Sequence, residues 1–349
     1  MTSHRTPVVI VGAGPIGIEL AVAFRREDIP FELLDAGCVG HTMSWWAPQT
    51  RWFSSNERIA IAGIPLLTVD QGKATREEYL TYLRSVLSQH RISVRTHSKV
   101  TEICRSRDGF ELRYESSGVS HPMRASAVVL AIGGTDFPNR LQIPGDDLPH
   151  VDGYLRETHR YYGRRVLVIG GRNSAVEAAL RLHHAGATVA LSYRGERLPE
   201  KSIKYWLWPE INGLINAGRI KAYFSSRPVE ITSTEVILQD DDGRRARVAT
   251  DDVLALIGYA QDKSLFRSAG VTLSGPQEVP SFDPATMETD VPDLYVAGTA
   301  IAGTQSSKYR IFLENCHEHV DRIVAAVTGK RPASAEPAYQ SQVAAQPES

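Results

Sequence analysis

Three glycines near the N-terminus stand in a spacing that suits phosphate binding. Gly12, Gly14 and Gly17 follow an apolar run at residues 8–11 and open a segment with helical periodicity. In this arrangement the first glycine permits a tight strand-to-helix turn, the second lets the backbone approach a pyrophosphate, and the third allows close helix packing. The free N–H groups at the helix start would bind the phosphates without a cationic side chain. Asp35, 18 positions beyond Gly17, can accept hydrogen bonds from ribose hydroxyls, so the pattern predicts a dinucleotide site.

A degenerate version of this motif occurs about 160 positions later. A second apolar run leads to Gly170 and Gly171, but Arg172 stands where a third glycine is usual. The following strand ends without a carboxylate at the place of Asp35, and Arg194 and Arg197 lie nearby. Because a guanidinium matches the geometry of a phosphate, Arg194, together with Arg197, would bind the 2′-phosphate of NADPH. The alternative is that both are ordinary solvated surface arginines.

Cys316 and His319 are candidates for chemistry beyond binding. They lie three positions apart near the start of an expected helix, hence on one face. A helix N-terminus and a histidine would both lower the pKa of a thiol and favour catalysis. The alternative is a small buried core residue. No metal site is predicted from Cys316, His317 and His319, because adjacent residues diverge on a helix and a fourth ligand is missing.

The elements that must position these motifs alternate between short β-branched runs and helical segments, which is typical of βαβ units with a parallel sheet. Helices are expected to end near residues 26 and 184 after the two glycine motifs, and to span residues 76–90 and 310–328. Strands are expected at residues 8–11, 31–35, 92–102, 110–114, 127–131, 165–169, 188–192, 251–257 and 293–297. The predicted fold class is α/β with two Rossmann-like dinucleotide-binding domains.

Two segments rich in turn residues, near residues 137–154 and 261–267, indicate where the chain crosses between these domains. The second domain is therefore expected to be inserted into the first. The tail is rich in Pro, Ala, Ser and Gln and is expected to be disordered. The expected boundaries are residues 1–150 and 263–330 for the first domain, 151–262 for the second, and 331–349 for the tail.

Composition excludes several classes of function. The formal net charge of the 349 residues is -1, so no positive field would attract nucleic acid or an anionic membrane. Three cysteines, Cys38, Cys104 and Cys316, lie far apart and form neither a CxxC pair nor a zinc-finger spacing. No run approaches the roughly 18 apolar residues of a membrane span. These features predict a soluble protein of the reducing cytoplasm.

Further segments carry a resemblance to a known family. Ala131-Ile132-Gly133-Gly134-Thr135 and Tyr295-Val296-Ala297-Gly298 resemble the turn and the strand that close the flavin site in two-dinucleotide flavoproteins of the thioredoxin-reductase branch. Within that branch, segments 49–55, 170–175, 202–204 and 311–315 resemble most closely the bacillithiol-disulfide (bacilliredoxin) reductases, including a basic residue at Arg172. The resemblance covers the chain to about residue 330.

The resemblance implies FAD in the first domain and NADPH in the second, with a hydride passing from NADPH to FAD and electrons then passing to an acceptor. It also implies a homodimer. The residues expected at FAD are Gly12, Gly14, Pro15, Ile16, Gly17, Asp35, Trp45, Val100, Ala131, Gly133, Gly298 and Thr299. Those expected at NADPH are Gly170, Gly171, Arg172, Asn173, Ser174, Ala175, Arg194 and Arg197.

Three positions depart from the relatives. The redox CxxC of the thioredoxin reductases is missing, since residues 151–165 contain no cysteine. The bacillithiol-disulfide reductases share a cysteine directly after the Gly-Pro of the first motif, and here that position is Ile16. Thr299 replaces an aspartate that many relatives have, and it can hydrogen-bond but brings no charge. The sequence therefore predicts that electrons leave the flavin without either cysteine arrangement.

Two aromatic clusters remain open to interpretation. Trp45, Trp46 and Trp52 either stack against a flavin ring or form a hydrophobic lid or a domain contact. The segment 205–208, flanked by lysines, either packs a helix within the second domain or against another subunit, or provides a docking rim for a protein acceptor.

The acceptor is expected to be a low-molecular-weight disulfide, as the resemblance implies. One alternative is a small redox protein, in the manner of ferredoxin or flavodoxin reductases of this fold that lack redox cysteines. A second is oxygen, in a flavin monooxygenase. A third is a protein that binds FAD or NADPH as a sensor or structural ligand without turnover, although two adjacent dinucleotide sites have little use without electron transfer.

Overall fold

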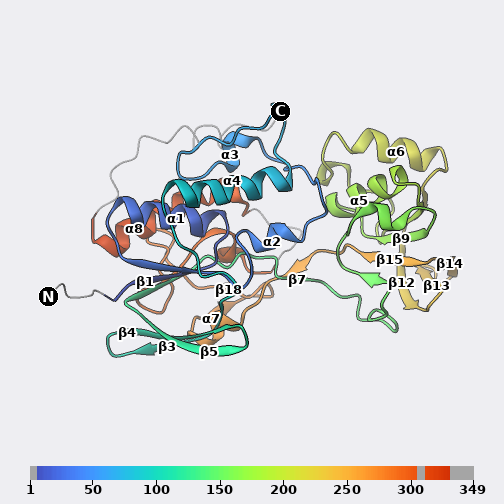
Figure 1. Ribbon diagram of the computed structural model, residues 1–349. Coiled ribbons are helices and arrows are strands. Elements are labelled where there is room, and N and C mark those ends of the chain that lie inside the picture. The colour runs from blue at the N-terminus through green and yellow to red at the C-terminus, as the bar shows by residue number, and fades with distance from the viewer. Residues whose placement is uncertain (1–5, 305–310, 331–349) are drawn as a thin grey trace. The chain divides into compact units, whose positions relative to one another are not determined.

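Two α/β units make up the computed structural model, which describes residues 6–304 and 311–330 (Figure 1). The second unit interrupts the first in the sequence, so the chain returns to the first unit after leaving it. The first unit comprises residues 1–45, 49–137 and 260–349, and the second comprises residues 46–48 and 138–259.

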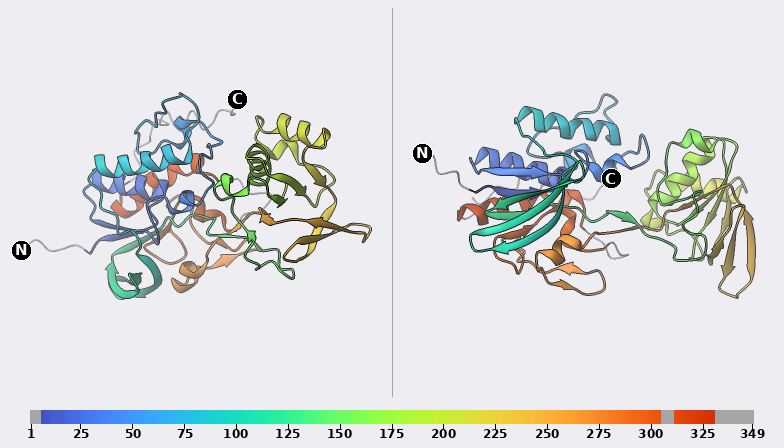
Figure 2. Two further views of the ribbon diagram at one scale, coloured as in Figure 1. Left: turned by 45° about the vertical axis from the view of Figure 1, so that its right-hand side comes forward. Right: turned by 60° about the horizontal axis from the view of Figure 1, so that its bottom comes forward.

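A four-stranded parallel sheet forms the centre of the first unit. Its order is β19-β6-β1-β2, so β19, from the C-terminal part of the chain, joins the sheet beside β6. Helices α1, α4 and α8 lie on one side of this sheet and the antiparallel sheet β3-β4-β5 lies on the other (Figures 1 and 2). The bounds are β1 (Val8–Val11), β2 (Phe31–Leu34), β3 (Lys99–Ser106), β4 (Gly109–Ser116), β5 (Val119–Ala125), β6 (Ala127–Leu130), β19 (Leu294–Val296), α1 (Pro15–Arg26), α4 (Arg76–Gln89) and α8 (His317–Thr328).

Local sequence explains where the helices of the first unit begin and end. Pro15 occupies the first turn of α1, where its missing N–H costs nothing. Thr75 and Glu78 form a capping box at the start of α4, in which each side chain bonds the other residue's backbone N–H. Gly329 ends α8 in the left-handed conformation, with φ 67°.

Short elements complete the first unit. They lie in the connections between the main strands and helices. Their bounds are α2 (His41–Ser44), α3 (Asn56–Ile59), α7 (Ser264–Ser268), β17 (Leu273–Ser274), β18 (Val279–Pro280) and the 3-10 helices η3 (Gly298–Ala302) and η4 (Leu313–Asn315). β7 (Phe137–Pro138) and β16 (Tyr259–Ala260), where the chain leaves and re-enters the first unit, form a separate two-stranded sheet.

The second unit repeats the plan with a five-stranded parallel sheet in the order β11-β10-β9-β15-β8. Figure 1 shows α5 and α6 on one side and the antiparallel sheet β12-β13-β14 on the other. The bounds are β8 (Val151–Asp152), η1 (Thr158–Tyr161), β9 (Arg165–Ile169), α5 (Asn173–His184), β10 (Thr188–Ser192), η2 (Glu200–Ser202), α6 (Trp208–Asn216), β11 (Lys221–Tyr223), β12 (Ser226–Ile231), β13 (Glu235–Asp240), β14 (Arg245–Ala249) and β15 (Asp252–Ala255).

Two hydrophobic cores hold the second unit together. One includes buried residues of α5, α6 and the parallel sheet, and the other includes residues of the parallel sheet and of β12-β13-β14. Leu141, Ile143 and Leu148 pack against the second of these cores. Because the turn-rich segment that carries them packs there, the chain passes to the second unit after Phe137 and not at the expected residue 150.

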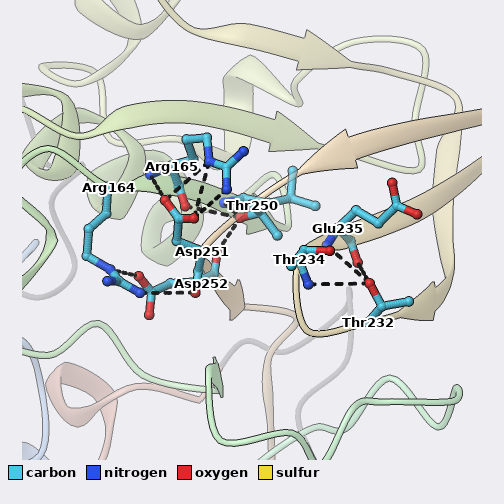
Figure 3. A network of polar contacts seen from close by, with 9 residues as sticks. Arg164, Arg165, Thr232, Thr234, Glu235, Thr250, Asp251 and Asp252 are labelled. Atoms are coloured by element: carbon cyan, nitrogen blue, oxygen red, sulfur yellow. Dashed lines mark hydrogen bonds and ion pairs between the residues drawn. The ribbon is translucent and has the colours of Figure 1, made fainter.

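A network of polar contacts ties β9 to β15 at the N-terminal ends of both strands (Figure 3). The backbone N–H of Arg165 donates to Asp251 at 2.8 Å, and the guanidiniums of Arg164 and Arg165 pair with Asp252 and Asp251 respectively. The Thr250 hydroxyl donates to the carbonyl of Asp252 at 2.7 Å. Gly170 follows the opposite end of β9, so this network fixes the sheet and takes no part in the glycine motif.

Two expected elements differ from the structure. The strand expected at residues 92–102 begins only at Lys99, and before it Arg95 makes a single parallel bridge with Leu34. The helix expected from residue 310 begins at His317; residue 310 lies outside the described residues. Strand β5 was not among the expected elements; it contains Pro122, which an edge strand tolerates.

Candidate functional site

The first glycine motif adopts a backbone that only glycine fits at two of its three positions. Gly12 has φ 109°, and a Cβ there would lie 2.4 Å from the carbonyl oxygen of Ala131. A Cβ at Gly17 would lie 1.9 Å from the carbonyl oxygen of Gly12. By contrast, nothing lies within 4 Å of a Cβ at Gly14. The motif is therefore packed closely on the sheet side and open beside its middle glycine.

That open side faces the start of α1. Gly14 is the N-cap residue of the helix and provides no side-chain cap, and the first turn contains no acidic residue. The first N–H groups of a helix have no partner within the helix and carry partial positive charge. The arrangement is therefore suited to a pyrophosphate, which accepts hydrogen bonds from such groups.

Asp35 is buried behind the motif. One carboxylate oxygen accepts the N–H of Ala13 at 2.7 Å and the other accepts the N–H of Gly37 at 2.8 Å. Desolvation raises the pKa of Asp35, and these two backbone donors oppose the rise. The carboxylate thus holds the loop after β2 against the motif, and a contact with ribose remains a prediction.

Two loops from distant parts of the sequence join the motif. The Cβ position of Gly298, after β19, lies 3.4 Å from the Cβ of Ile16 in α1. The Cβ position of Gly133, after β6, lies 4.0 Å from the hydroxyl of Thr299. The structure therefore brings together the first motif, the turn after β6 and the loop after β19, from which most of the expected FAD residues come.

The other two expected FAD residues lie elsewhere in the same unit. Trp45 follows α2 and is half-buried, while Val100 is buried in β3. A role for either residue at FAD remains a prediction.

The prediction that the helix N-terminus and His319 lower the pKa of Cys316 is wrong. Cys316 is fully buried, its thiol donates to the carbonyl of Phe312 at 3.0 Å, and burial raises its pKa well above the ordinary value. A thiol in this state is a poor nucleophile at neutral pH, because the thiolate is the reactive form. The structure thus favours the alternative of a core residue, and a catalytic role for Cys316 remains without support.

His319 acts on the backbone of the loop after β19. Its Nδ1 accepts the N–H of Gly298 at 3.1 Å, so the ring must be unprotonated at that nitrogen. Burial lowers the pKa of His319 to about 4, with smaller contributions from Arg322 and His317. The observed role of this histidine is therefore to hold Gly298 in place, and no contact with Cys316 through its ring is resolved.

Glu19 and His317 form a buried pair between α1 and α8 that the sequence analysis did not identify. His317 Nδ1 lies 2.7 Å from Glu19, and its Nε2 lies 3.0 Å from the carbonyl of Arg58. Although burial lowers it, the hydrogen bond and charge of Glu19 raise the pKa of His317 above its ordinary value. The available signal was an acidic residue inside an otherwise apolar helix.

The second motif has the same backbone path in the second unit. Gly170 has φ 141°, and a Cβ there would lie 2.4 Å from the carbonyl oxygen of Leu256. Arg172 is the N-cap residue of α5, as Gly14 is of α1. Val11 pairs with Leu34 and Ile169 pairs with Ser192, so Tyr193 occupies the place of Asp35.

Three exposed arginines belong to this motif and to the loop after β10. Arg172, Arg194 and Arg197 are exposed, and none forms an ion pair or hydrogen bond through its side chain with another of the described residues. Tyr193 lies against the backbone of Gly171, where a Cβ would come within 2.4 Å of its ring. Tyr193 thus stands where an NADH site would have a carboxylate, and the exposed Arg194 directly follows it.

The remaining residues of the motif are used by the protein itself. The Asn173 side chain accepts the N–H of Lys204 at 2.7 Å, and the Lys204 ammonium pairs with Glu177 at 3.0 Å. Ser174 hydrogen-bonds the hydroxyl of Tyr259, whose pKa burial raises to about 12. The segments 170–175 and 202–204 are therefore held together, and direct contacts of Asn173 and Ser174 with a cofactor remain predictions.

A sequence profile of the family described as "Pyridine nucleotide-disulphide oxidoreductase" matches residues 9–298. The chain belongs to this family. It is 31% identical over 320 residues to the bacilliredoxin reductase Bdr of Bacillus subtilis, covering 91% of this chain and 96% of that protein. It is 26% identical over 302 residues to a ferredoxin–NADP reductase of Ignicoccus hospitalis, covering 83% and 88%.

Solved structures agree with this membership. The structure of the bacillithiol disulfide reductase Bdr from Bacillus cereus matches with a TM-score of 0.87 and 30% identity, covering 93% of this chain and 99% of that one. The thioredoxin reductase of T. acidophilum matches with a TM-score of 0.71 at 19% identity, which shows the shared fold. The predicted fold class and the predicted resemblance are thereby confirmed.

Membership makes this chain an FAD-dependent oxidoreductase that uses a nicotinamide cofactor. The residues present fit both groups. Gly14 leaves open space beside the uncapped start of α1, which a pyrophosphate can occupy. In the second unit, the backbone at Gly170 packs against Leu256 and the backbone at Gly171 packs against the Tyr193 ring, and Arg172 is exposed at the start of α5.

Within residues 6–304 and 311–330, no helix has the length and apolar character needed to span a bilayer.

Proposed function

We propose that this chain is an NADPH-preferring FAD oxidoreductase that reduces a low-molecular-weight disulfide. When bound, the two cofactors supply hydride transfer and the storage of two electrons. The chain itself would bind the 2′-phosphate of NADPH through its arginines and the pyrophosphate of FAD through backbone N–H groups. It would also hold the loops after β6 and β19 beside FAD. The observation that carries the proposal is the set of free arginines at the second motif.

Preference for NADPH follows from charge and geometry in the second unit. A carboxylate at the end of the second strand would accept the ribose hydroxyls of NADH and repel a 2′-phosphate. Here Tyr193 stands at that place, and Arg194 follows it directly. Since Arg194 and Arg197 bind no other described residue through their side chains, their guanidiniums are available to a phosphate.

The disulfide acceptor is supported by the relatives named bacilliredoxin or bacillithiol disulfide reductase, at 30% to 31% identity. This chain departs from their motif at Ile16, which is buried and packs against Gly298. Cys316 is also buried, with a raised pKa. The disulfide would therefore be reduced without a thiol from either position.

A second candidate is a ferredoxin-type reductase, in which single electrons pass to a small protein. The specific observation that favours it is the buried, apolar Ile16, because one-electron transfer needs no thiol on the protein. A relative named ferredoxin–NADP reductase covers most of the chain at 26% identity.

An acceptor panel with the purified holoenzyme tests the proposal. Steady-state turnover would be measured with NADPH or NADH at matched concentrations, against asymmetric low-molecular-weight disulfides, ferredoxin, flavodoxin and oxygen. We expect NADPH to be preferred and a disulfide to give the highest kcat/KM. Turnover with ferredoxin alone would support the second candidate, and equal use of NADH and NADPH would contradict the cofactor preference.

A further inference from the structure

Gln261 joins the two loops that approach the first glycine motif. Its side chain is buried, with 5% of its surface exposed, immediately after the chain returns to the first unit. The amide nitrogen donates to the carbonyl of Gly133 at 2.7 Å and to the carbonyl of Ala300 at 3.1 Å. Both amide hydrogens are therefore used to bridge the turn after β6 and the 3-10 helix after β19.

These two loops carry residues expected at FAD. The Cβ position of Gly133 lies 4.0 Å from the hydroxyl of Thr299, and Ala300 directly follows Thr299. His319 holds the same loop from its other end, through the N–H of Gly298. The position of Thr299 relative to Gly133 is thus set by two buried side chains, of which only Gln261 contacts both loops among the described residues.

Lys263 determines which way the Gln261 amide points. Its side chain is 3% exposed, and its ammonium donates to the carbonyl oxygen of Gln261. An ammonium can only donate, so it cannot face the amide nitrogen. If the amide turned over, its oxygen would face two carbonyl oxygens and its nitrogen would face the ammonium, which is unfavourable on all three sides.

The buried cation has few other partners. Within the described residues, Lys263 forms no ion pair, and desolvation lowers its pKa. Asp136 is the charged group nearby whose own pKa is most altered. Burial raises the pKa of Asp136 to about 6, and its carboxylate accepts the N–H of Asp262 at 2.8 Å.

We propose that Gln261 and Lys263 are positioning residues for FAD: Gln261 fixes the separation of the loops that carry Gly133 and Thr299, and Lys263 fixes the orientation of the Gln261 amide. This inference rests on the proposed placement of FAD along Gly14, Gly133 and Thr299. Neither residue needs to contact the flavin. Both act through the backbone groups that Gln261 binds.

Titration of the full-length apoprotein with FAD tests the inference through binding and not through turnover. The variants are Q261L, which removes both donors, and K263M, which keeps a long buried side chain but removes the charge. Lys99→Met is the matched control, because Lys99 is an exposed lysine of the same unit. We expect the Kd for FAD to rise about tenfold in Q261L and several-fold in K263M, and to stay unchanged in K99M.

Thermal unfolding of the apoproteins separates positioning from general stability. K263M is expected to change the apoprotein Tm little, because removing a desolvated charge offsets the loss of the donor to the Gln261 carbonyl, while its FAD affinity falls. A K263M protein with unchanged Kd would overturn the role of Lys263, and a Q261L protein with unchanged Kd would overturn that of Gln261. Gly14→Val tests the placement of FAD along Gly14, Gly133 and Thr299. If G14V loses FAD while Q261L and K263M bind it normally, the placement is supported and the positioning roles of Gln261 and Lys263 are refuted. If G14V binds FAD normally, the placement of FAD is itself refuted.

Discussion

The two glycine motifs share one backbone and differ in charge. Gly12 and Gly170 both have positive φ, and a Cβ at either would lie 2.4 Å from a carbonyl oxygen of the neighbouring strand. At the next comparable position the first motif has Gly14 and the second has Arg172, each as the N-cap of a helix. At the end of the following strand the first has Asp35 and the second has Tyr193.

This difference shows how one local fold is adapted to two ligands. The strand-turn-helix geometry supplies backbone N–H groups at the helix start in both units, which is sufficient for a pyrophosphate. The first unit uses Asp35 to hold the loop after β2 against the motif. The second adds Arg172, Arg194 and Arg197, whose guanidiniums pair with no other residue in the described part of the chain, which suits a ligand with an additional phosphate.

The largest effect is expected from filling the space at Gly12. Gly12→Val places a branched side chain at φ 109° and against the carbonyl of Ala131, so we expect a loss of about 3 kcal/mol or more in the free energy of unfolding. Gly14→Ala is the matched control for stability, because nothing lies within 4 Å of its Cβ. Chemical denaturation of both apoproteins measures the difference, and equal stability would show that the turn is not constrained as described.

A smaller effect is expected from removing the arginines that distinguish the second motif. The double variant R194A/R197A should raise the KM for NADPH about 10- to 100-fold and change that for NADH little, because only NADPH carries the additional phosphate. Arg219→Ala is the control, since Arg219 is an exposed arginine of the same unit. If the double variant weakened NADH and NADPH equally, the arginines would have no role in choosing between them.

In the first unit a neutral histidine, His319, holds the loop after β19, and the pH dependence of this contact provides the next test. His319→Ala leaves the N–H of Gly298 without an acceptor, at a cost of about 1–3 kcal/mol in the free energy of unfolding at pH 7. The pKa of His319 is lowered to about 4 from 6.5, so its stabilisation is complete above pH 6.5 and is lost as the pH falls through 4. Denaturation of wild type and variant across this range should show the difference shrinking; a constant difference would mean that the ring does not act as a neutral acceptor.

The smallest effect on turnover is expected at Cys316. Cys316→Ser keeps a small side chain that can donate to the carbonyl of Phe312, so disulfide turnover should stay within about twofold of wild type. The free energy of unfolding should fall by about 1 kcal/mol, since a buried hydroxyl is less favourable than a thiol. A large loss of turnover in a folded, FAD-loaded variant would restore Cys316 as a catalytic candidate.

Sequence was sufficient where the determinants are local. The run at residues 8–11, the glycine spacing and Pro15 lie within a few positions of one another, and the first βαβ unit forms as they predict. The start of β3 was placed too early because the β-branched residues Ile92, Val94 and Thr96 alternate with other residues as they would in a strand, while tertiary contacts decide where pairing begins.

The remaining features depend on contacts between distant parts of the chain. Gln261 bridges Gly133 and Ala300, and no spacing in the sequence indicates that these three come together. The same reason explains the error at Cys316. Its place at a helix start was visible, but the burial that raises its pKa arises from packing.

Rapid anaerobic mixing of the oxidised holoenzyme with NADPH, and separately with NADH, tests the central claim most directly. The signal is the loss of the oxidised flavin absorbance band. We predict bleaching with both nucleotides, and at low concentration a much faster rate with NADPH, an advantage that R194A/R197A removes. If neither nucleotide bleached the flavin, electron transfer from a nicotinamide cofactor to FAD would be contradicted. Equal rates with NADPH and NADH would contradict the preference for NADPH that the arginines of the second unit are proposed to give.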